Sequence, residues 1–282
     1  MNDGDLLIRR DGPVAVLTLN RPGHLNALDD SLLSALDSAL AEVDADGGVR
    51  VVVLTGAGRA FCSGADMGGP GRDYSGVPSL PPAERDAELR RIGDATRDGL
   101  VDRFHPLMLR LRQFMKPVIC AVNGVAAGGG VGLALSCDIV VAARAASFVQ
   151  VFAPKLGLVP DCGATWYLPR IVGTPRALAL ALLGDALPAQ EAQRLGLVWK
   201  VTEGDDLLPE ALRIAARLAA NPGHVNALVK QAILASQGNT LAEQLDLEAR
   251  LQGDCGAMPS FVEGVMAFQQ KRAPVFHPTS AD

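Results

Sequence analysis

The chain has 282 residues, of which 49% are hydrophobic and 20% charged, so it can bury a sizeable core and disorder is not expected. Its formal net charge of −5 argues against a nucleic-acid groove or an anionic membrane surface as partner. The apolar runs have the length of strands rather than membrane spans, and the N-terminus shows no basic region followed by an apolar stretch. We therefore expect a cytoplasmic protein that uses neither nucleic acid nor membrane as partner.

Residue types that often carry metal or hydrolytic chemistry are scattered along the chain. The five cysteines and four histidines form no CxxC pair and no HExxH motif, which argues against a disulfide framework and against a metal site. The sequence also contains no GxSxG, no GxxxxGK[ST] and no GxGxxG. These absences disfavour a serine hydrolase, a P-loop enzyme and a dinucleotide-binding domain.

The predicted elements begin with a strand over residues 14–19, followed by a helix that Asp30 or Ser31 can cap. Residues 49–55 and 117–122 are continuous apolar runs, which are typical of strands buried on both faces. Residues 139–143 predict a further strand. The pattern indicates an α/β core.

Two segments interrupt or follow this core. Residues 68–82 hold four glycines and four prolines and predict a loop, whereas the charged stretch 84–98 fits either a solvated helix or partial disorder. After residue 201 the chain changes to helical periodicity in Ala and Leu. We therefore predict a strand–helix core over residues 1–200, containing an insert loop at 68–98, and a helical region over 201–282.

Two glycine-rich strand exits, at residues 55–66 and 123–132, are the most informative features for function. Each places small residues at the carboxyl end of a strand, where the backbone can approach a ligand closely. The glycine triplet 128–130 opens a small-residue helix, whose free N–H groups favour a developing negative charge. Taken singly, either segment is better explained as a tight turn with close helix–sheet packing.

Together these segments resemble the crotonase (enoyl-CoA hydratase/isomerase) superfamily over nearly the whole chain. The matching stretches are 21–28 (RPGHLNAL), 61–66 (FCSGAD), 116–124 (KPVICAVNG), 137–139 (CDI) and 263–272 (EGVMAFQQKR). The resemblance implies a spiral of ββα units with a C-terminal helical region that builds homotrimers, commonly paired into hexamers. It also implies acyl-CoA thioesters as substrates, with coenzyme A as part of the substrate and no metal or redox cofactor.

The resemblance further implies roles for individual residues. The oxyanion-hole N–H groups, which would hold a thioester enolate, fall on Ala65 and Gly129. The implied contacts to coenzyme A are His24, Leu25, Ser63, Asp66, Phe268 and Lys271. The last two would close over the nucleotide, often from a neighbouring subunit. For Lys271 and the adjacent Arg272, a solvated basic patch at a helix end remains the alternative.

The chain departs from the hydratases of this superfamily, which use two glutamates. The first position holds Gly132, and the second falls on Phe152 or Ala153. General acid–base catalysis needs a titratable group within reach, so ordinary hydration is doubtful. One carboxylate remains nearby, that of Asp161 in the run 155–163 (KLGLVPDCG).

Asp161 has two interpretations. As a turn residue it would cap the next helix, but related crotonases that isomerise epoxidised aromatic acyl-CoA place a catalytic Asp at a similar motif. We therefore expect an acyl-CoA isomerase with Asp161 as its single acid/base. The alternatives are an enoyl-CoA hydratase and a catalytically silent acyl-CoA-binding paralogue.

Overall fold

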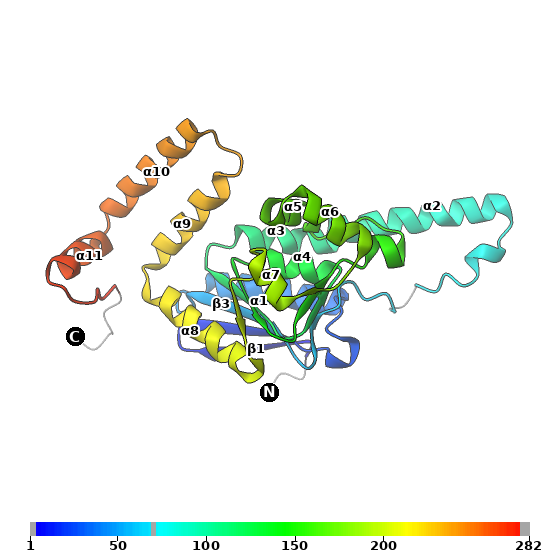
Figure 1. Cartoon of the computed structure of the whole chain (residues 1–282), viewed down its shortest axis with the longest axis horizontal. Coiled ribbons are helices and arrows are strands. Elements are labelled where there is room, and N and C mark those ends of the chain that lie inside the picture. The colour runs from blue at the N-terminus through cyan, green and yellow to red at the C-terminus, as the bar shows by residue number, and fades with distance from the viewer. Residues whose placement is uncertain (1–3, 69–71, 277–282) are drawn as a thin grey trace.

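The computed structural model describes residues 4–68 and 72–276, and its described strands form two sheets (Figure 1). The larger sheet has the order β1-β2-β3-β5-β7-β10 and the smaller one the order β4-β6-β8-β9. The larger sheet consists of β1 (Leu6–Asp11), β2 (Val14–Leu19), β3 (Val51–Gly56), β5 (Val118–Val122), β7 (Ile139–Ala143) and β10 (Lys200–Thr202). The smaller sheet consists of β4 (Ala60–Cys62), β6 (Val125–Ala127), β8 (Ser147–Val149) and β9 (Leu187–Pro188). Apart from the antiparallel pairs β1–β2 and β8–β9, neighbouring strands are parallel.

Helices connect and cover the strands. Those before β10 are α1 (Asp30–Ala45), α2 (Pro82–Gly99), α3 (His105–Gln113), α4 (Gly129–Leu135), α5 (Ala164–Val172), α6 (Thr174–Leu183) and α7 (Ala189–Arg194). Those after it are α8 (Leu207–Ala220), α9 (Gly223–Ala235), α10 (Leu241–Gly256) and α11 (Pro259–Gln269). Short 3-10 turns lie at Pro22–His24, Val77–Ser79 and Gly204–Asp206, and π-helical turns at Leu100–Phe104 and Phe152–Leu156. No helix in the described part of the chain is long and apolar enough to cross a bilayer.

The central strands of the larger sheet are buried on both faces, as the continuous apolar runs of β3 and β5 predict. One face and the smaller sheet share the main core with helices that include α1, α3 and α4. The opposite face packs against α8, whose inward residues are Leu207, Ala211, Ile214, Ala215 and Ala219. The predicted division at residue 200 stays a prediction. The first helix after it, α8, covers one face of the sheet, which would otherwise expose a row of valines.

Two arms extend from opposite ends of this core (Figure 1). At one end α9, α10 and α11 project outward, and Lys230 anchors α9 through its Nζ, which lies 2.7 Å from Asp138 Oδ2 and 2.5 Å from the Phe114 carbonyl oxygen. At the other end α2 projects with residues 72–81 beside it. The charged stretch 84–98 is therefore helical, and the predicted insert loop is not a loop throughout.

The observed bounds of several elements match those predicted from the sequence, but the observed N-cap of α1 differs from the predicted one. The strands predicted at 14–19 and 139–143 are β2 and β7. Helix α1 starts at Asp30, but its N-cap is Asp29, whose Oδ1 accepts a hydrogen bond of 2.9 Å from the Leu32 N–H. The predicted cap at Asp30 or Ser31 is thus wrong, because Asp29 is the residue with extended backbone three positions before a free N–H.

Candidate active site

The two glycine-rich strand exits meet where β4 ends and α4 begins. A Cβ at Gly64 would lie 2.9 Å from the Ala127 carbonyl oxygen and 3.0 Å from the Gly129 nitrogen, and Gly64 has φ +92°. Both the conformation and the close approach therefore require glycine at this position. Gly128, with φ +52°, turns the chain into α4. The sequence in these segments brings Ala65 and Gly129 onto adjoining loops.

The N–H groups of Ala65 and Gly129 have no hydrogen-bond acceptor among the described residues. Gly129 is the first residue of α4, where the helix leaves backbone N–H groups without internal partners. Free N–H groups at such a position favour negative charge. The two groups are therefore available to an oxygen atom of a ligand.

Both residues line a cavity of about 550 Å³. Asp161 and Ser63 line it as well, so four of the predicted site residues share one space. The arm around α2 supplies much of the remaining wall, and sequence reasoning did not single out its residues. They are Arg72, Tyr74, Ile92, Ala95, Thr96, Gly99, Leu100, Arg103 and Phe104.

The Asp161 carboxylate is the acidic group of this cavity. Its Oδ1 is buried without a hydrogen-bond partner in the described structure, and burial raises the pKa of Asp161 above its ordinary value. Helix α5 has Gly163 as N-cap and receives no side-chain cap. The alternative in which Asp161 caps the next helix is therefore wrong: the residue contributes only a backbone carbonyl there, to the Ala164 N–H.

The positions at which superfamily hydratases carry glutamate hold no titratable side chain. Gly132 lies on α4, and a Cβ there would meet the carbonyl oxygen of Cys162 at 2.3 Å. Phe152 is buried and opens a π-helical turn, and Ala153 follows it. The neighbouring thiols are also poor acids, since burial raises the pKa of Cys62 to about 12 and raises that of Cys162 further.

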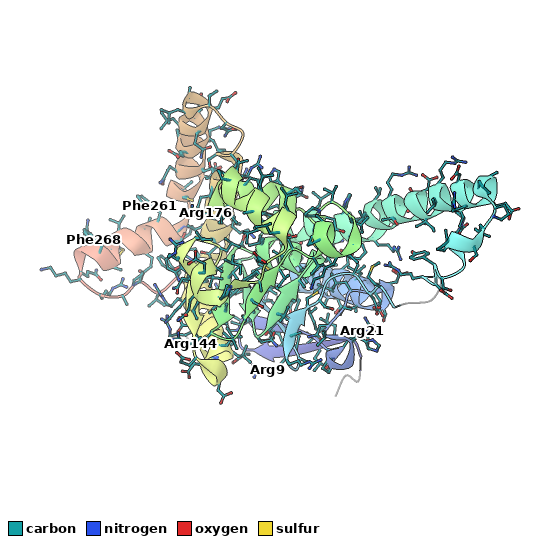
Figure 2. All side chains as sticks on the ribbon, turned by 45° about the vertical axis from the view of Figure 1, so that its right-hand side comes forward. Arg9, Arg21, Arg144, Arg176, Phe261 and Phe268 are labelled. Atoms are coloured by element: carbon teal, nitrogen blue, oxygen red, sulfur yellow. The ribbon has the colours of Figure 1, made fainter. Side chains whose placement is uncertain are left out.

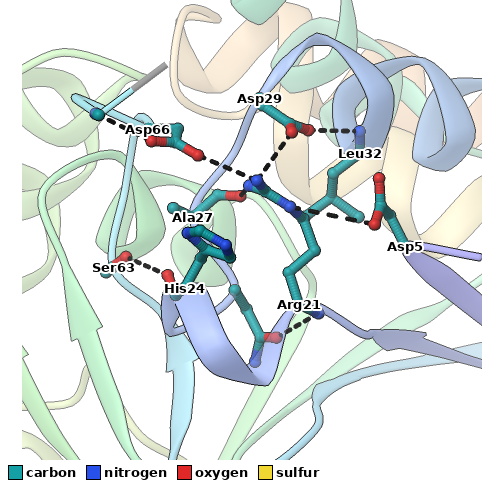
Figure 3. A network of polar contacts seen from close by, with 10 residues as sticks. Asp5, Arg21, His24, Ala27, Asp29, Leu32, Ser63 and Asp66 are labelled. Carbon is teal, nitrogen blue, oxygen red and sulfur yellow. Dashed lines mark hydrogen bonds and ion pairs between the residues drawn. The ribbon is translucent and has the colours of Figure 1, made fainter.

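A second carboxylate, Asp66, lies beside the cavity but has partners (Figure 3). Its Oδ2 is 3.0 Å from Arg21 Nη2, and its Oδ1 accepts a 3.0 Å hydrogen bond from the Gly68 N–H. That backbone hydrogen bond, followed by the Arg21 guanidinium, holds the pKa of Asp66 below its ordinary value. Arg21 also pairs with Asp29 at 2.9 Å. The cluster fixes the loop before α1 to the loop after β4.

At the edge of this cluster His24 is exposed and Leu25 is half-buried. The Ser63 hydroxyl donates to the His24 carbonyl at 3.4 Å, and Leu25 has a left-handed backbone with φ 51°. Beneath them Asn26 is fully buried, and its Nδ2 donates to the Ala57 and Ala60 carbonyls at 2.9 and 2.8 Å. The sequence placed Asn26 in a turn on the expected path of coenzyme A, but it did not predict that Arg21 and Asn26 hold this turn through their hydrogen bonds. A charged residue and an amide near Pro-Gly are a usable signal for such a bonded turn.

The structure does not bring Phe268 and Lys271 to this cavity. Phe268 is 85% exposed on α11, at the end of the C-terminal arm (Figure 2). It lines a separate apolar hollow between α9, α10 and α11. Arg272 is held by Glu263 at 2.6 Å, so it is not a free cation next to Lys271.

The family model described as enoyl-CoA hydratase/isomerase matches residues 9–78 and 86–279. The chain belongs to this family. The resemblance to the crotonase superfamily is confirmed, and so is the α/β crotonase fold with its C-terminal helices. In the described residues no three His, Cys, Asp or Glu side chains are placed to hold a metal ion.

Curated relatives of this family member carry different names. The 1,2-epoxyphenylacetyl-CoA isomerase of Escherichia coli K12 is 45% identical over 93% of this chain and 94% of that protein. A protein of Rhodobacter capsulatus named "probable enoyl-CoA hydratase" is 41% identical, with the same two coverages. Among solved structures, an enoyl-CoA hydratase from Polaromonas sp. JS666 has a TM-score of 0.84 at 34% identity, covering 95% of this chain and 98% of that one. The names therefore include both isomerases and hydratases.

Proposed function

We propose that the chain is an acyl-CoA thioester isomerase in which Asp161 is the single acid/base. One observation carries the proposal: a buried carboxylate oxygen without a partner faces the same cavity as two free N–H groups. A buried carboxylate oxygen without a partner is costly, and burial raises the pKa of Asp161 despite the opposing effect of the Cys162 thiol. Perturbed carboxylates in cavities are typical of active sites. The same arrangement argues against a silent acyl-CoA-binding paralogue, which has no use for it.

The chemistry follows from these groups. The thioester oxygen accepts hydrogen bonds from the Ala65 and Gly129 N–H groups, which stabilise the enolate formed when the α-proton leaves. Asp161 takes that proton, and the electron pair of the C–H bond moves into the enolate. The protonated Asp161 then returns the proton to another carbon, so the double bond shifts and no atom is gained or lost. With an epoxide next to the α-carbon, the electron pair forms a C=C bond and the epoxide C–O bond breaks. The oxygen that is released takes the proton back from Asp161, so the product is again an isomer of the substrate.

For the substrate we propose a ring-epoxidised phenylacetyl-CoA or a close analogue. The named isomerase at 45% identity supports this class. The apolar residues of the cavity wall, which include Ile92, Leu100, Phe104 and Phe152, also favour a bulky hydrophobic acyl group. The reaction moves a proton within one molecule, so we propose that it uses no metal and no redox cofactor.

The second candidate is hydration of an enoyl-CoA, which the name of the Rhodobacter relative favours. Hydration needs one group to activate water and a means of placing a proton on the α-carbon. Gly132 and Phe152 supply neither, and Asp66 is engaged by Arg21. Isomerisation is the better fit, because it needs only one proton-carrying group.

We further propose that His24, Leu25 and Ser63 line the path of coenzyme A, and that Asp66 holds that path in shape through Arg21. Phe268 and Lys271 would then serve the site of a neighbouring copy in a homotrimer or hexamer. The exposed apolar residues of the C-terminal arm support this assembly, among them Leu241 and Leu245. Light scattering at micromolar concentration should give a trimeric or hexameric mass, and a monomer would contradict it.

An assay of the purified protein by liquid chromatography with mass spectrometry tests the function directly, because chromatography separates isomers that have the same mass. Ring-epoxidised phenylacetyl-CoA, cis-3-enoyl-CoA and crotonyl-CoA are offered separately to the wild-type protein and to Asp161→Asn. We expect isomerisation of at least one of the first two by the wild type alone. Conversion of crotonyl-CoA only, or equal conversion by both proteins, would contradict the proposal.

A further inference from the structure

The turn that carries Asp161 packs directly against position 132 of α4. A Cβ at Gly132 would lie 2.3 Å from the Cys162 carbonyl oxygen, 2.9 Å from the carbonyl carbon and 2.6 Å from the Cys162 Cβ. None of these atoms belongs to the mobile end of a side chain, so no rotamer change relieves the contact. The backbone of the turn fills the space that a side chain at position 132 would need.

The backbone of this turn and a second contact with α4 constrain it further. Cys162 is 2% exposed and has φ +49°, and Gly163 follows it with φ +80°. A left-handed backbone is uncommon for a residue other than glycine and persists where the surroundings impose it. The Cys162 Sγ lies 3.0 Å from the position of a Cβ at Gly129, so Cys162 contacts α4 at two successive turns.

We propose that Gly132 and Cys162 are positioning residues that hold the Asp161 carboxylate in the cavity. The turn that carries Asp161 then leaves no space for a side chain at position 132. The inference rests on the proposed function, because it concerns how the carboxylate reaches the substrate. In this chain glycine at the first hydratase position is a requirement of the Asp161 turn. A glutamate at position 132 and the observed turn are mutually exclusive.

The proposal has a consequence for both rate and pH dependence. If a side chain at position 132 displaces the turn from α4, the Asp161 carboxylate moves away from its position near Gly129 and becomes accessible to water. A displacement of about 1 Å in an active site can lower the rate about 100-fold. Exposure to water also lowers a carboxylate pKa that burial had raised.

The test is Gly132→Ala, assayed for isomerisation over a range of pH, with Asp161→Asn beside it. We expect kcat to fall at least about 100-fold and KM to change less than about threefold, with the acid limb of kcat shifted to lower pH. The matched control is Gly124→Ala, whose Cβ would meet the Arg59 carbonyl oxygen at 2.1 Å away from the turn. It should lower the Tm similarly, yet retain kcat within about tenfold and keep the acid limb.

The outcomes separate the two proposals. An active Gly132→Ala with an unchanged acid limb, together with an inactive Asp161→Asn, overturns the positioning role and leaves the proposed function intact. A fully active Asp161→Asn overturns the proposed function itself.

If Gly132→Ala does not fold, Cys162→Gly and Cys162→Val test the contact from the turn. Glycine tolerates φ +49° but loses the contact of the Cys162 Sγ with α4, so kcat should fall less than in β-branched valine, which should lose at least about 100-fold. Equal kcat values in these two variants would overturn the inference.

Discussion

Two aspartates beside the same cavity have opposite surroundings. Asp66 lies against Arg21 and accepts the Gly68 N–H, whereas the Oδ1 of Asp161 is buried with no partner in the described structure. The pKa of Asp66 is accordingly lowered and that of Asp161 raised. The carboxylate that is well bonded stabilises the loops, and the one that is poorly bonded is available to chemistry.

The largest expected difference between the two is catalytic. Asp161→Asn should lower the isomerisation rate at least about 1,000-fold with coenzyme A binding changed less than about threefold, since asparagine cannot accept the α-proton. Asp66→Asn should act mainly on KM, with kcat lowered less than about tenfold. Steady-state kinetics and ligand titration of both variants measure this difference. A larger loss of kcat in Asp66→Asn would reverse the assignment.

The rate of hydration also distinguishes Asp66 from Asp161, because hydration would require a second carboxylate that is not held by other side chains. With Asp66 engaged by Arg21, we expect crotonyl-CoA hydration far below the turnover of about 10 per second that is typical of enzymes. Absorbance of the enoyl thioester reports this rate. Rapid hydration that disappears in Asp66→Asn would show that Asp66 activates water.

The pH dependence of kcat separates the same residues. Asp161 acts as a base only when ionised, so kcat should rise with pH through a pKa above the ordinary value of about 3.9. The position of this acid limb should be unchanged in Asp66→Asn, because the pKa of Asp66 is lowered and does not contribute to the limb. Rates from pH 4 to 9 test this, and an acid limb at or below about pH 4 would contradict the raised pKa.

The smallest expected effect is on stability, and its sign differs between the two variants. The lowered pKa of Asp66 contributes stability above about pH 4, which is lost as the pH falls, so Asp66→Asn should destabilise the protein at pH 7 by about 1 kcal/mol. The raised pKa of Asp161 has the opposite consequence. Its charge disfavours the folded state once the pH exceeds about 4 and rises through the folded-state pKa, so Asp161→Asn should stabilise the protein at pH 7.

Urea denaturation at pH 7 and pH 3.5 measures both effects at one protein concentration. The difference for Asp161→Asn should be lost at pH 3.5, where this carboxyl is largely protonated in both states, whereas the difference for Asp66→Asn should shrink only in part, because the lowered pKa keeps folded Asp66 ionised there. A destabilised Asp161→Asn at pH 7 would indicate that the carboxylate has a bonded, structural role.

Much of this arrangement could be predicted from the sequence, for local reasons. Continuous apolar runs predicted β3 and β5, and the resemblance to the crotonase superfamily predicted that Ala65 and Gly129 share one site. The lack of a titratable residue at position 132 was visible as well. What local patterns could not predict depends on contacts distant in the chain: α8 as a layer of the core, and the Arg21–Asp66 pair across 45 positions.

The arm that contains α2 shows the same limit of prediction from local sequence. Charge and poor apolar periodicity over 84–98 were compatible with helix or disorder, and only the three-dimensional structure shows that α2 lines the cavity. The steric relation between Gly132 and Cys162 was equally invisible, since it depends on where two backbones meet. Such contacts decide which carboxylate is left without a partner.

The central claim is that Asp161 moves the α-proton, and hydrogen–deuterium exchange tests it most directly. Phenylacetyl-CoA is incubated in D2O with the wild-type protein, Asp161→Asn or Asp66→Asn, and deuterium at the α-carbon is followed by mass spectrometry. The account predicts enzyme-dependent exchange with the wild type and Asp66→Asn, and only the background rate with Asp161→Asn. Exchange by Asp161→Asn at the wild-type rate would contradict it.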